Sequence, residues 1–242
     1  MRAPQDPNRQ PTSSRNTGLG PYEFPVLGSY PDRSRRALNV LVALVGIVMT
    51  LPLWVIIGIS IKLTSRGPVF YSQSRVGLDK RRSGMRADDP RRRLDVGGRP
   101  FRIYKFRTMY LGAEEGTGPI WAAEGDERIT PIGRFLRQYR LDELPQLLNV
   151  LNGEMNVVGP RPERPSIFAK LRERIPNYHL RQRIAPGITG HAQINQKYDS
   201  SLEDVTSKVE FDLQYIDQAS TWEDLKIMLK TIPVMLFRRG GR

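Results

Sequence analysis

The chain has 242 residues, a formal net charge of +13 and an apolar content of 39%, which suits one folded domain with appendages. It contains no cysteine and only two histidines, His179 and His191. This composition excludes a disulfide-stapled module, a thiol nucleophile, an iron–sulfur cluster and a zinc site built from Cys or several His ligands. A metal bound here would take oxygen ligands, as Mg²⁺ does.

The N-terminal residues 1–36 are expected to form a disordered basic arm. They carry six prolines, six basic and three acidic side chains, and they show no apolar periodicity. Segments of this composition bury too little apolar surface to fold. The alternative is a binding tail.

Residues 37–61 form an apolar run of 25 residues without an ionisable side chain. A helix of this length could cross a bilayer. Pro52 near its middle removes a backbone donor and predicts a break. Basic residues flank both ends of the run: Arg33, Arg35, Arg36, Lys62 and Arg66. Because positive flanks favour the cytoplasm, we expect a re-entrant helix–break–helix. A straight crossing and a buried soluble helix remain the alternatives.

Two short strands are predicted at residues 69–76 and 101–106, joined by a long polar loop. They lie in the most basic part of the chain, since residues 62–110 have a net charge of +10. A local excess of this size suggests an anionic partner. Nucleic acid, an acidic membrane surface and a phosphorylated substrate all qualify.

The rest of the chain reads as mainly helical. Apolar spacing predicts helices at residues 132–139, 143–151 and 165–175. Two Ser/Thr-x-x-Asp patterns, Ser201 to Asp204 and Thr221 to Asp224, resemble capping boxes that open two more helices. The last of these, from Trp222, is amphipathic and basic, so it lies either in a membrane interface or on the core of the domain. The predicted fold class is therefore α+β and mainly helical.

Asp142 and Glu143 are adjacent carboxylates at a predicted helix start. The structural interpretation makes Asp142 an ordinary N-cap and Glu143 an ordinary first-turn acid. The functional interpretation makes Asp142 a nucleophile or a metal ligand, because carboxylates form covalent aspartyl-phosphates and a nearby cation neutralises the phosphoryl group.

Three further segments carry cations that could hold phosphate. Two prolines flank Arg161, which predicts a rigid anion clamp or a solvated loop. Arg183 precedes a Gly/Pro loop at residues 185–190 that either cradles phosphate or merely turns. Lys105 and Arg107 alternate with apolar residues, as on one face of a strand.

Together, these segments resemble one family, the bacterial sugar transferases, in the form of the small monotopic polyprenol-phosphate phosphoglycosyl transferases. The motifs FRIYKFRTM, IGRFLR, LDELPQLLNVLNGEMNVVGPRPE and RIAPGITGHAQIN follow the apolar run in this order. The resemblance covers the chain from about Ala37 to its C-terminus, and DELPQL with VGPRP is its most specific part.

The resemblance implies a reaction and a location. The family moves a sugar-1-phosphate from a UDP-sugar to undecaprenyl phosphate and releases UMP. The phosphosugar is held covalently on the first residue of an Asp-Glu dyad, here Asp142 and Glu143, with Mg²⁺ at Asp142. A helix broken at a proline, here Pro52, enters and leaves by the cytoplasmic face of the bacterial inner membrane.

The resemblance also assigns basic residues to phosphate binding, and the sequence departs from the family pattern at three places. Its basic positions match Lys105, Arg107, Arg137 and Arg161, and Arg183 is added as a phosphate contact. The segment 80–95 is longer and more basic than expected. His191 replaces a usual Trp, and Arg140 replaces a small hydroxyl residue.

The expected organisation is an arm at 1–36, a membrane segment at 37–61 and a catalytic domain at 62–242 that ends in an interfacial helix. The rival interpretation is a non-catalytic membrane-anchored module whose basic loop binds anionic lipid or nucleic acid. We expect anionic membrane as a partner and no nucleic acid, because the basic stretch matches no nucleic-acid-binding motif and contains Asp88 and Asp89. A homodimer is left open.

Overall fold

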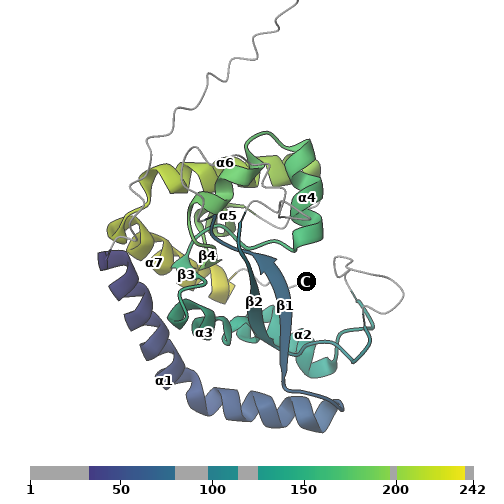
Figure 1. Cartoon of the computed structure of the whole chain (residues 1–242). Coiled ribbons are helices and arrows are strands. Elements are labelled where there is room, and N and C mark those ends of the chain that lie inside the picture. The colour runs from purple at the N-terminus through teal and green to yellow at the C-terminus, as the bar shows by residue number, and fades with distance from the viewer. Residues whose placement is uncertain (1–32, 80–97, 114–124, 197–200, 238–242) are drawn as a thin grey trace, which may run out of the picture.

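A computed structural model describes residues 33–79, 98–113, 125–196 and 201–237 (Figure 1). Most of the predicted arm and the basic segment 80–95 lie outside these residues. Helices dominate, with two small sheets beside them, which confirms the α+β, mainly helical class. The elements in chain order are α1 (Arg33–Thr64), β1 (Phe70–Val76), β2 (Pro100–Phe106), α2 (Pro131–Gln138), η1 (Leu141–Glu143), α3 (Gln146–Leu151), β3 (Asn156–Val158), α4 (Pro165–Arg174), η2 (Tyr178–Arg183), β4 (Gly187–Thr189), α5 (His191–Asn195), α6 (Leu202–Gln218) and α7 (Thr221–Phe237).

The apolar run forms one bent helix, α1, rather than two helices with a break. It begins at Arg33, inside the predicted arm, and its backbone stays helical through Pro52. Pro52 has no N–H to give to the carbonyl four residues earlier, and its ring crowds that turn, which bends a helix without ending it. Figure 1 shows the two legs of α1 meeting at an angle around the rest of the domain.

Only a narrow stripe of α1 is covered by the rest of the described protein. Its buried residues are Asn39, Ala43, Ile57 and Ile61. The exposed apolar residues on its other sides are Leu41, Leu44, Val45, Val48, Met49, Leu51, Val55, Ile56, Ile59 and Leu63. Within the described residues, α1 is the one helix long and apolar enough to cross a membrane, judged by length and composition.

The predicted hairpin is present and carries Lys105. Strands β1 and β2 pair antiparallel, with Phe70 opposite Phe106 and Val76 opposite Pro100. Phe70 and Phe106 stack with their ring centroids 5.3 Å apart, and Trp54 of α1 meets the Phe106 ring edge-on at 5.6 Å. The hairpin therefore stands on the second leg of α1.

A second sheet, absent from the sequence-based prediction, joins two segments read as loops. Strands β3 and β4 pair in parallel, with Asn156 opposite Gly187 and Val158 opposite Thr189. A Cβ on Gly187 would lie 2.1 Å from the backbone nitrogen of Gly159, so only glycine allows this approach. The pairing sets the position of the loop that carries Arg161.

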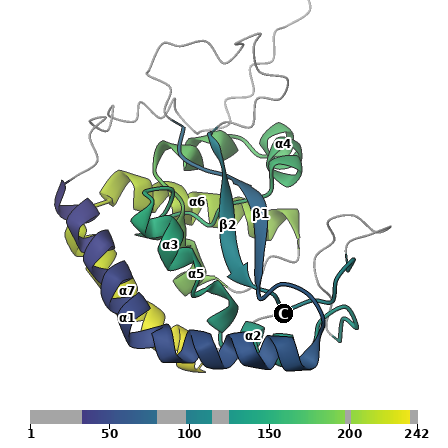
Figure 2. The ribbon, with the colours of Figure 1, turned by 60° about the horizontal axis from the view of Figure 1, so that its bottom comes forward.

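The C-terminal helices hold the first turn of α1. The capping box at Ser201 and Asp204 is confirmed. The one at Thr221 and Asp224 is wrong, because the Ser220 hydroxyl caps α7 by accepting from the Glu223 amide. Asp224 is instead fully buried and accepts a hydrogen bond from Arg35 at 3.0 Å. In Figures 1 and 2, α7 lies along the first leg of α1.

Candidate active site

The acidic pair lies in a tight turn between α2 and α3. Arg140 has φ 54°, a left-handed conformation that is uncommon outside glycine, and the short helix η1 follows at once. Asp142 and Glu143 are each 6% exposed. No side chain caps η1, and α3 begins only after Pro145. Asp142 is therefore not the N-cap of the predicted helix, and capping does not account for the pair.

Two cations from distant segments meet the pair. The Lys105 Nζ atom lies 3.0 Å from Glu143 Oε1 and 3.4 Å from Asp142 Oδ2. Arg161, three residues beyond β3, holds Glu143 with both terminal nitrogens, Nη2 to Oε1 at 2.6 Å and Nη1 to Oε2 at 3.4 Å. Glu143 is thus clamped, whereas among the described residues Asp142 has one long contact and its Oδ1 atom has none.

The two carboxyl groups differ in their pKa values. Burial is the largest influence on both, and by itself it raises each pKa. For Asp142 burial prevails over the charge of Lys105, and the neighbouring Glu143 charge adds to it, so the pKa is raised. For Glu143 the charges of Arg161 and Lys105 and the Arg161 hydrogen bond outweigh burial and hold the pKa well below its usual range. Glu143 is consequently a fixed anion, and Asp142 is the desolvated, weakly paired carboxylate.

A buried ion pair supports the Arg161 loop from behind. Arg181 in η2 donates through Nε to Asp212 of α6 at 2.7 Å, and both side chains are 2% exposed. Its other nitrogens donate to the Tyr178 hydroxyl at 2.8 Å and to the Arg161 carbonyl at 3.1 Å. Sequence reasoning missed this role, because Asp212 lies 31 residues away and no local pattern connects the two.

Replacing Asp212 by Asn should destabilise the fold strongly. The substitution leaves the Arg181 guanidinium buried without its counter-charge, which typically costs about 3–5 kcal/mol. Thermal unfolding of the protein in lipid nanodiscs would measure this loss. Asp217→Asn, at an exposed position of the same helix, is the matched control and should unfold like wild type. An unchanged unfolding temperature for Asp212→Asn would contradict the supporting role.

The other predicted cations are placed differently. Arg137 contributes a charge that lowers the pKa of Asp142, and its Nη1 atom is buried without a hydrogen-bond partner among the described residues. Arg107 is only 5% exposed, and its guanidinium donates to the carbonyls of Ser65 and Arg66 at the end of α1. Its guanidinium therefore has a structural contact at the end of α1, and its phosphate contact stays a prediction. Arg183 is exposed at the end of η2.

The acidic turn rests directly on the apolar helix. Leu141 and Leu144, on either side of the pair, pack into a cluster that contains Ile57 and Ile61 of α1. A Cβ on Gly46 would lie 3.1 Å from Leu147 of α3, so α3 also touches α1 near its middle. The carboxylates are thus held just above the inner side of the bend.

The donor atoms at this site suit a hard cation. The pair offers carboxylate oxygens, which Mg²⁺ prefers, and Mg²⁺ is usually bound by one or two carboxylates together with substrate phosphates. Within the described residues, the Asp142 Oδ1 atom accepts no hydrogen bond, since Lys105 contacts Oδ2. In the same residues there is no group of three or more His, Asp or Glu side chains that could hold a metal without a substrate.

These features define a class: a helix-rich α+β domain carried on a bent apolar helix, with a buried carboxylate pair among cations. Residues 30–86 and 89–238 match the family model described as bacterial sugar transferase. The chain therefore belongs to the bacterial sugar transferase family, as the motifs indicated.

Curated relatives agree with this assignment. A UDP-N-acetylgalactosamine-undecaprenyl-phosphate N-acetylgalactosaminephosphotransferase from Aeromonas hydrophila is 38% identical over 208 residues, covering 86% of this chain and 45% of that protein. UDP-glucose:undecaprenyl-phosphate glucose-1-phosphate transferases from Escherichia coli K12 and Caulobacter vibrioides are each 38% identical, over 82% and 85% of this chain. The chain spans 39% of the Escherichia coli protein and 70% of the Caulobacter protein.

Proposed function

We propose that this protein is a membrane-bound phosphoglycosyl transferase that moves a sugar-1-phosphate from a UDP-sugar to undecaprenyl phosphate and releases UMP. One observation carries the proposal: Glu143 is held by two cations while Asp142 is not, in a turn that packs against the apolar helix α1. The relatives of the chain are named for this transfer. Glu143 is fixed by two cations, and Asp142 keeps an oxygen free. In such an enzyme the step is the first membrane reaction of surface-glycan assembly.

The chemistry assigned to Asp142 is nucleophilic. Its free oxygen attacks the phosphorus that bears the sugar, a new O–P bond forms, and the bond to the bridging oxygen breaks as UMP leaves. A phosphate oxygen of the lipid then attacks the same phosphorus and releases Asp142. Lys105, Arg137 and Arg161 surround the region where the phosphate charges gather, and such fixed cations stabilise developing negative charge.

The proposal includes Mg²⁺, held by Asp142 together with substrate phosphates. Glu143 is less suited as a ligand, because both of its oxygens are already paired with cations. When bound, the ion would neutralise phosphate charge as UMP departs.

The attachment of α1 supports a re-entrant membrane segment. At its start, Arg36 donates to the carbonyls of Val150 and Leu151 at 2.6 and 2.7 Å. At its end, Arg107 holds Ser65 and Arg66. A straight helix of this length would be about 48 Å long, more than the roughly 30 Å hydrocarbon core. A bent helix with both ends on one domain is better explained by entry and exit at the same face, which we take to be cytoplasmic.

The polar side chains next to Pro52 form hydrogen bonds within α1. The Thr50 hydroxyl donates to the Gly46 carbonyl at 2.6 Å, and the Trp54 indole donates to Thr50 at 3.1 Å. Each of these polar groups is satisfied within the helix, as hydrocarbon requires.

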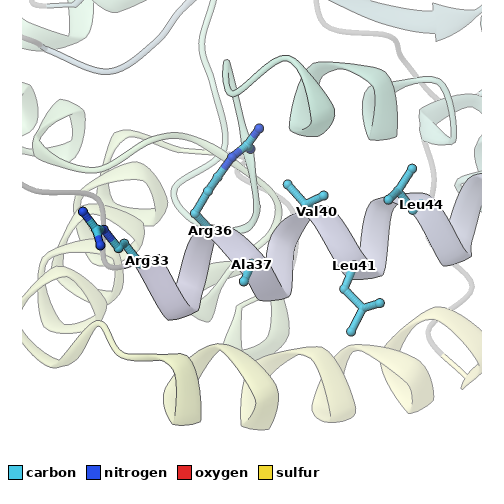
Figure 3. Close-up of a pocket in the computed structure, with 6 residues that line it drawn as sticks. All are labelled: Arg33, Arg36, Ala37, Val40, Leu41 and Leu44. Atoms are coloured by element: carbon cyan, nitrogen blue, oxygen red, sulfur yellow. The ribbon is translucent and has the colours of Figure 1, made fainter.

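The start of α1 also suits an anionic membrane surface. A groove of about 540 Å³ is lined by two cations and four apolar residues: Arg33, Arg36, Ala37, Val40, Leu41 and Leu44. Figure 3 shows the two arginines at the beginning of the helix and the apolar side chains following them. Cations at the headgroup level above apolar side chains match the layered polarity of a lipid leaflet.

The re-entrant topology predicts that the segments before and after α1 both stay inside the cell. Single cysteines at Ser13 and at Ser166, an exposed position of α4, report cleanly because the protein has no other cysteine. In intact cells neither should react with a membrane-impermeant thiol reagent, and both should react after lysis. Labelling at position 13 alone in intact cells would show a full crossing.

The reaction itself is tested with a panel of nucleotide sugars. The protein in nanodiscs that contain undecaprenyl phosphate is incubated with each UDP-sugar, and UMP is measured. We expect release with at least one of them, together with a lipid-linked diphosphosugar. If no UDP-sugar yields UMP, the proposed function is wrong.

Arg161 is expected to act on kcat/KM for the donor. Arg161→Lys keeps the charge but loses the planar fork that holds Glu143, so activity should fall about ten- to a hundredfold, and Arg161→Ala should lose more. Steady-state kinetics against UDP-sugar measure this difference. If Arg161→Ala matched wild type, the Pro-flanked loop would be only structural.

A further inference from the structure

A small cavity beside the acidic pair has no role in the reaction described above. Its volume is about 120 Å³, and it is enclosed by η1, α3, β4, α5 and α7. In Figure 1, α3, β4, α5 and α7 lie on the inner side of the bend in α1. Arg140 and Glu143 are the charged residues of its wall, and the apolar part comes from Leu144, Leu147, Ile188, Ile194 and Val234.

We propose that this cavity receives the first isoprene unit of the polyprenyl phosphate acceptor; the inference rests on the proposed function and adds the acceptor subsite. An apolar cavity of about 150 Å³ stays dry and binds benzene. A space of this size and lining therefore suits a five-carbon branched hydrocarbon unit. The phosphate attached to that unit would reach the carboxylates, because Glu143 is shared between the cavity and the catalytic pair.

The position of the cavity fits a ligand that arrives from lipid. Leu147 contacts α1 at Gly46, near the middle of the apolar helix. On α7, Val234 lines the cavity, while Leu229 and Ile232 on the same helix are 67% and 54% exposed. The cavity thus lies between the catalytic pair and two helices with exposed apolar side chains, α1, which the proposed function places in the bilayer, and α7.

Two hydroxyl groups of the wall satisfy each other. The hydroxyls of Thr189 and Thr231 are 2.8 Å apart, and Thr231 also donates to the Ile227 carbonyl. Gln193 differs, because its side-chain oxygen is buried without a hydrogen-bond partner among the described residues. A donor nucleobase in the cavity would lie against the polar Gln193 side chain, whereas an isoprene unit would gain nothing from it, so a substitution of Gln193 distinguishes the two occupants.

The test fills the cavity from two walls. Val234→Phe on α7 and Ile188→Phe on β4 each place a phenyl ring where the isoprene unit would lie. We expect KM for undecaprenyl phosphate to rise at least about tenfold, with the UMP burst from donor alone unchanged. Ile232→Phe, an exposed position on α7, is the matched control and should behave as wild type. Gln193→Leu should leave KM for UDP-sugar unchanged.

A binding measurement makes the result independent of turnover. An undecaprenyl phosphate with a photoactivatable diazirine in its first isoprene unit should cross-link to peptides of α3 or α7 without any donor, and Val234→Phe should reduce this labelling. Cross-linking there without UMP release from any UDP-sugar would support the subsite and refute the proposed reaction.

Three outcomes would overturn the subsite itself. They are an unchanged acceptor KM in both folded Phe variants, a raised donor KM in Gln193→Leu, and cross-links confined to other elements. Thermal unfolding establishes which Phe variants are folded. If neither variant folds, the position of the cross-links in the wild-type protein tests the subsite.

Discussion

Replacing Asp142 by Asn is expected to lower sugar-1-phosphate transfer by at least about three orders of magnitude. The amide has nearly the shape of the carboxylate but is a poor nucleophile. The fold should survive, because Asp142 caps no helix and Lys105, its one hydrogen-bond partner among the described residues, keeps a 3.0 Å contact with Glu143. Activity would be measured as UMP release, and the covalent phosphosugar by mass spectrometry of acid-quenched protein.

The comparison with Glu143 sharpens this prediction. Glu143→Gln removes the partner of Arg161 and the closer partner of Lys105, so it should weaken folding as well as activity. Asp142→Asn should instead unfold like wild type while forming no covalent adduct. A phosphosugar still attached to the Asp142→Asn protein, or substantial turnover by it, would show that another group is the nucleophile.

Removing divalent metal is expected to reduce turnover at least about a hundredfold, and Mg²⁺ should restore it. Two substrates bring several phosphate charges to a site that the protein lines with a few cations, and a hard ion supplies the remaining positive charge. The measurement is UMP release after treatment with EDTA, followed by titration with Mg²⁺.

A second readout separates a catalytic ion from a structural one. The thermal unfolding of the protein without substrate should not change with EDTA, because the described residues contain no group of three or more His, Asp or Glu side chains for a metal. A large loss of stability would indicate a structural metal instead. Full activity in metal-free buffer would refute the assignment of Mg²⁺.

The sequence alone predicted the features that depend on neighbours in the chain. Alternating side chains indicated the strands that the structure has at Phe70–Val76 and Pro100–Phe106. Apolar length indicated a helical segment at residues 37–61, although the break predicted at Pro52 is a bend within one helix, and the Ser201 to Asp204 spacing indicated a capping box. The adjacent acids and their flanking motifs pointed to the family before any contact was known.

Other features were decided by contacts between distant segments. Lys105, Glu143 and Arg161 come from three elements, and only their packing showed that Glu143 is clamped while Asp142 is not. Sequence reasoning gave Arg107 a phosphate contact and Arg181 no role, whereas in the structure Arg107 holds the end of α1 and Arg181 holds the Arg161 loop.

The bend of α1 and the parallel pairing of β3 with β4 also depend on contacts between distant segments. A proline in a sequence predicts a helical turn that lacks one hydrogen bond, but whether the helix ends or bends there depends on what packs around it. Two three-residue strands carry too little periodicity to be recognised, and their pairing arises from the close approach of Gly159 and Gly187. Local patterns therefore determined the elements and the chemical groups, and tertiary packing determined which groups meet, because burial and ion pairing depend on neighbours far apart in the chain.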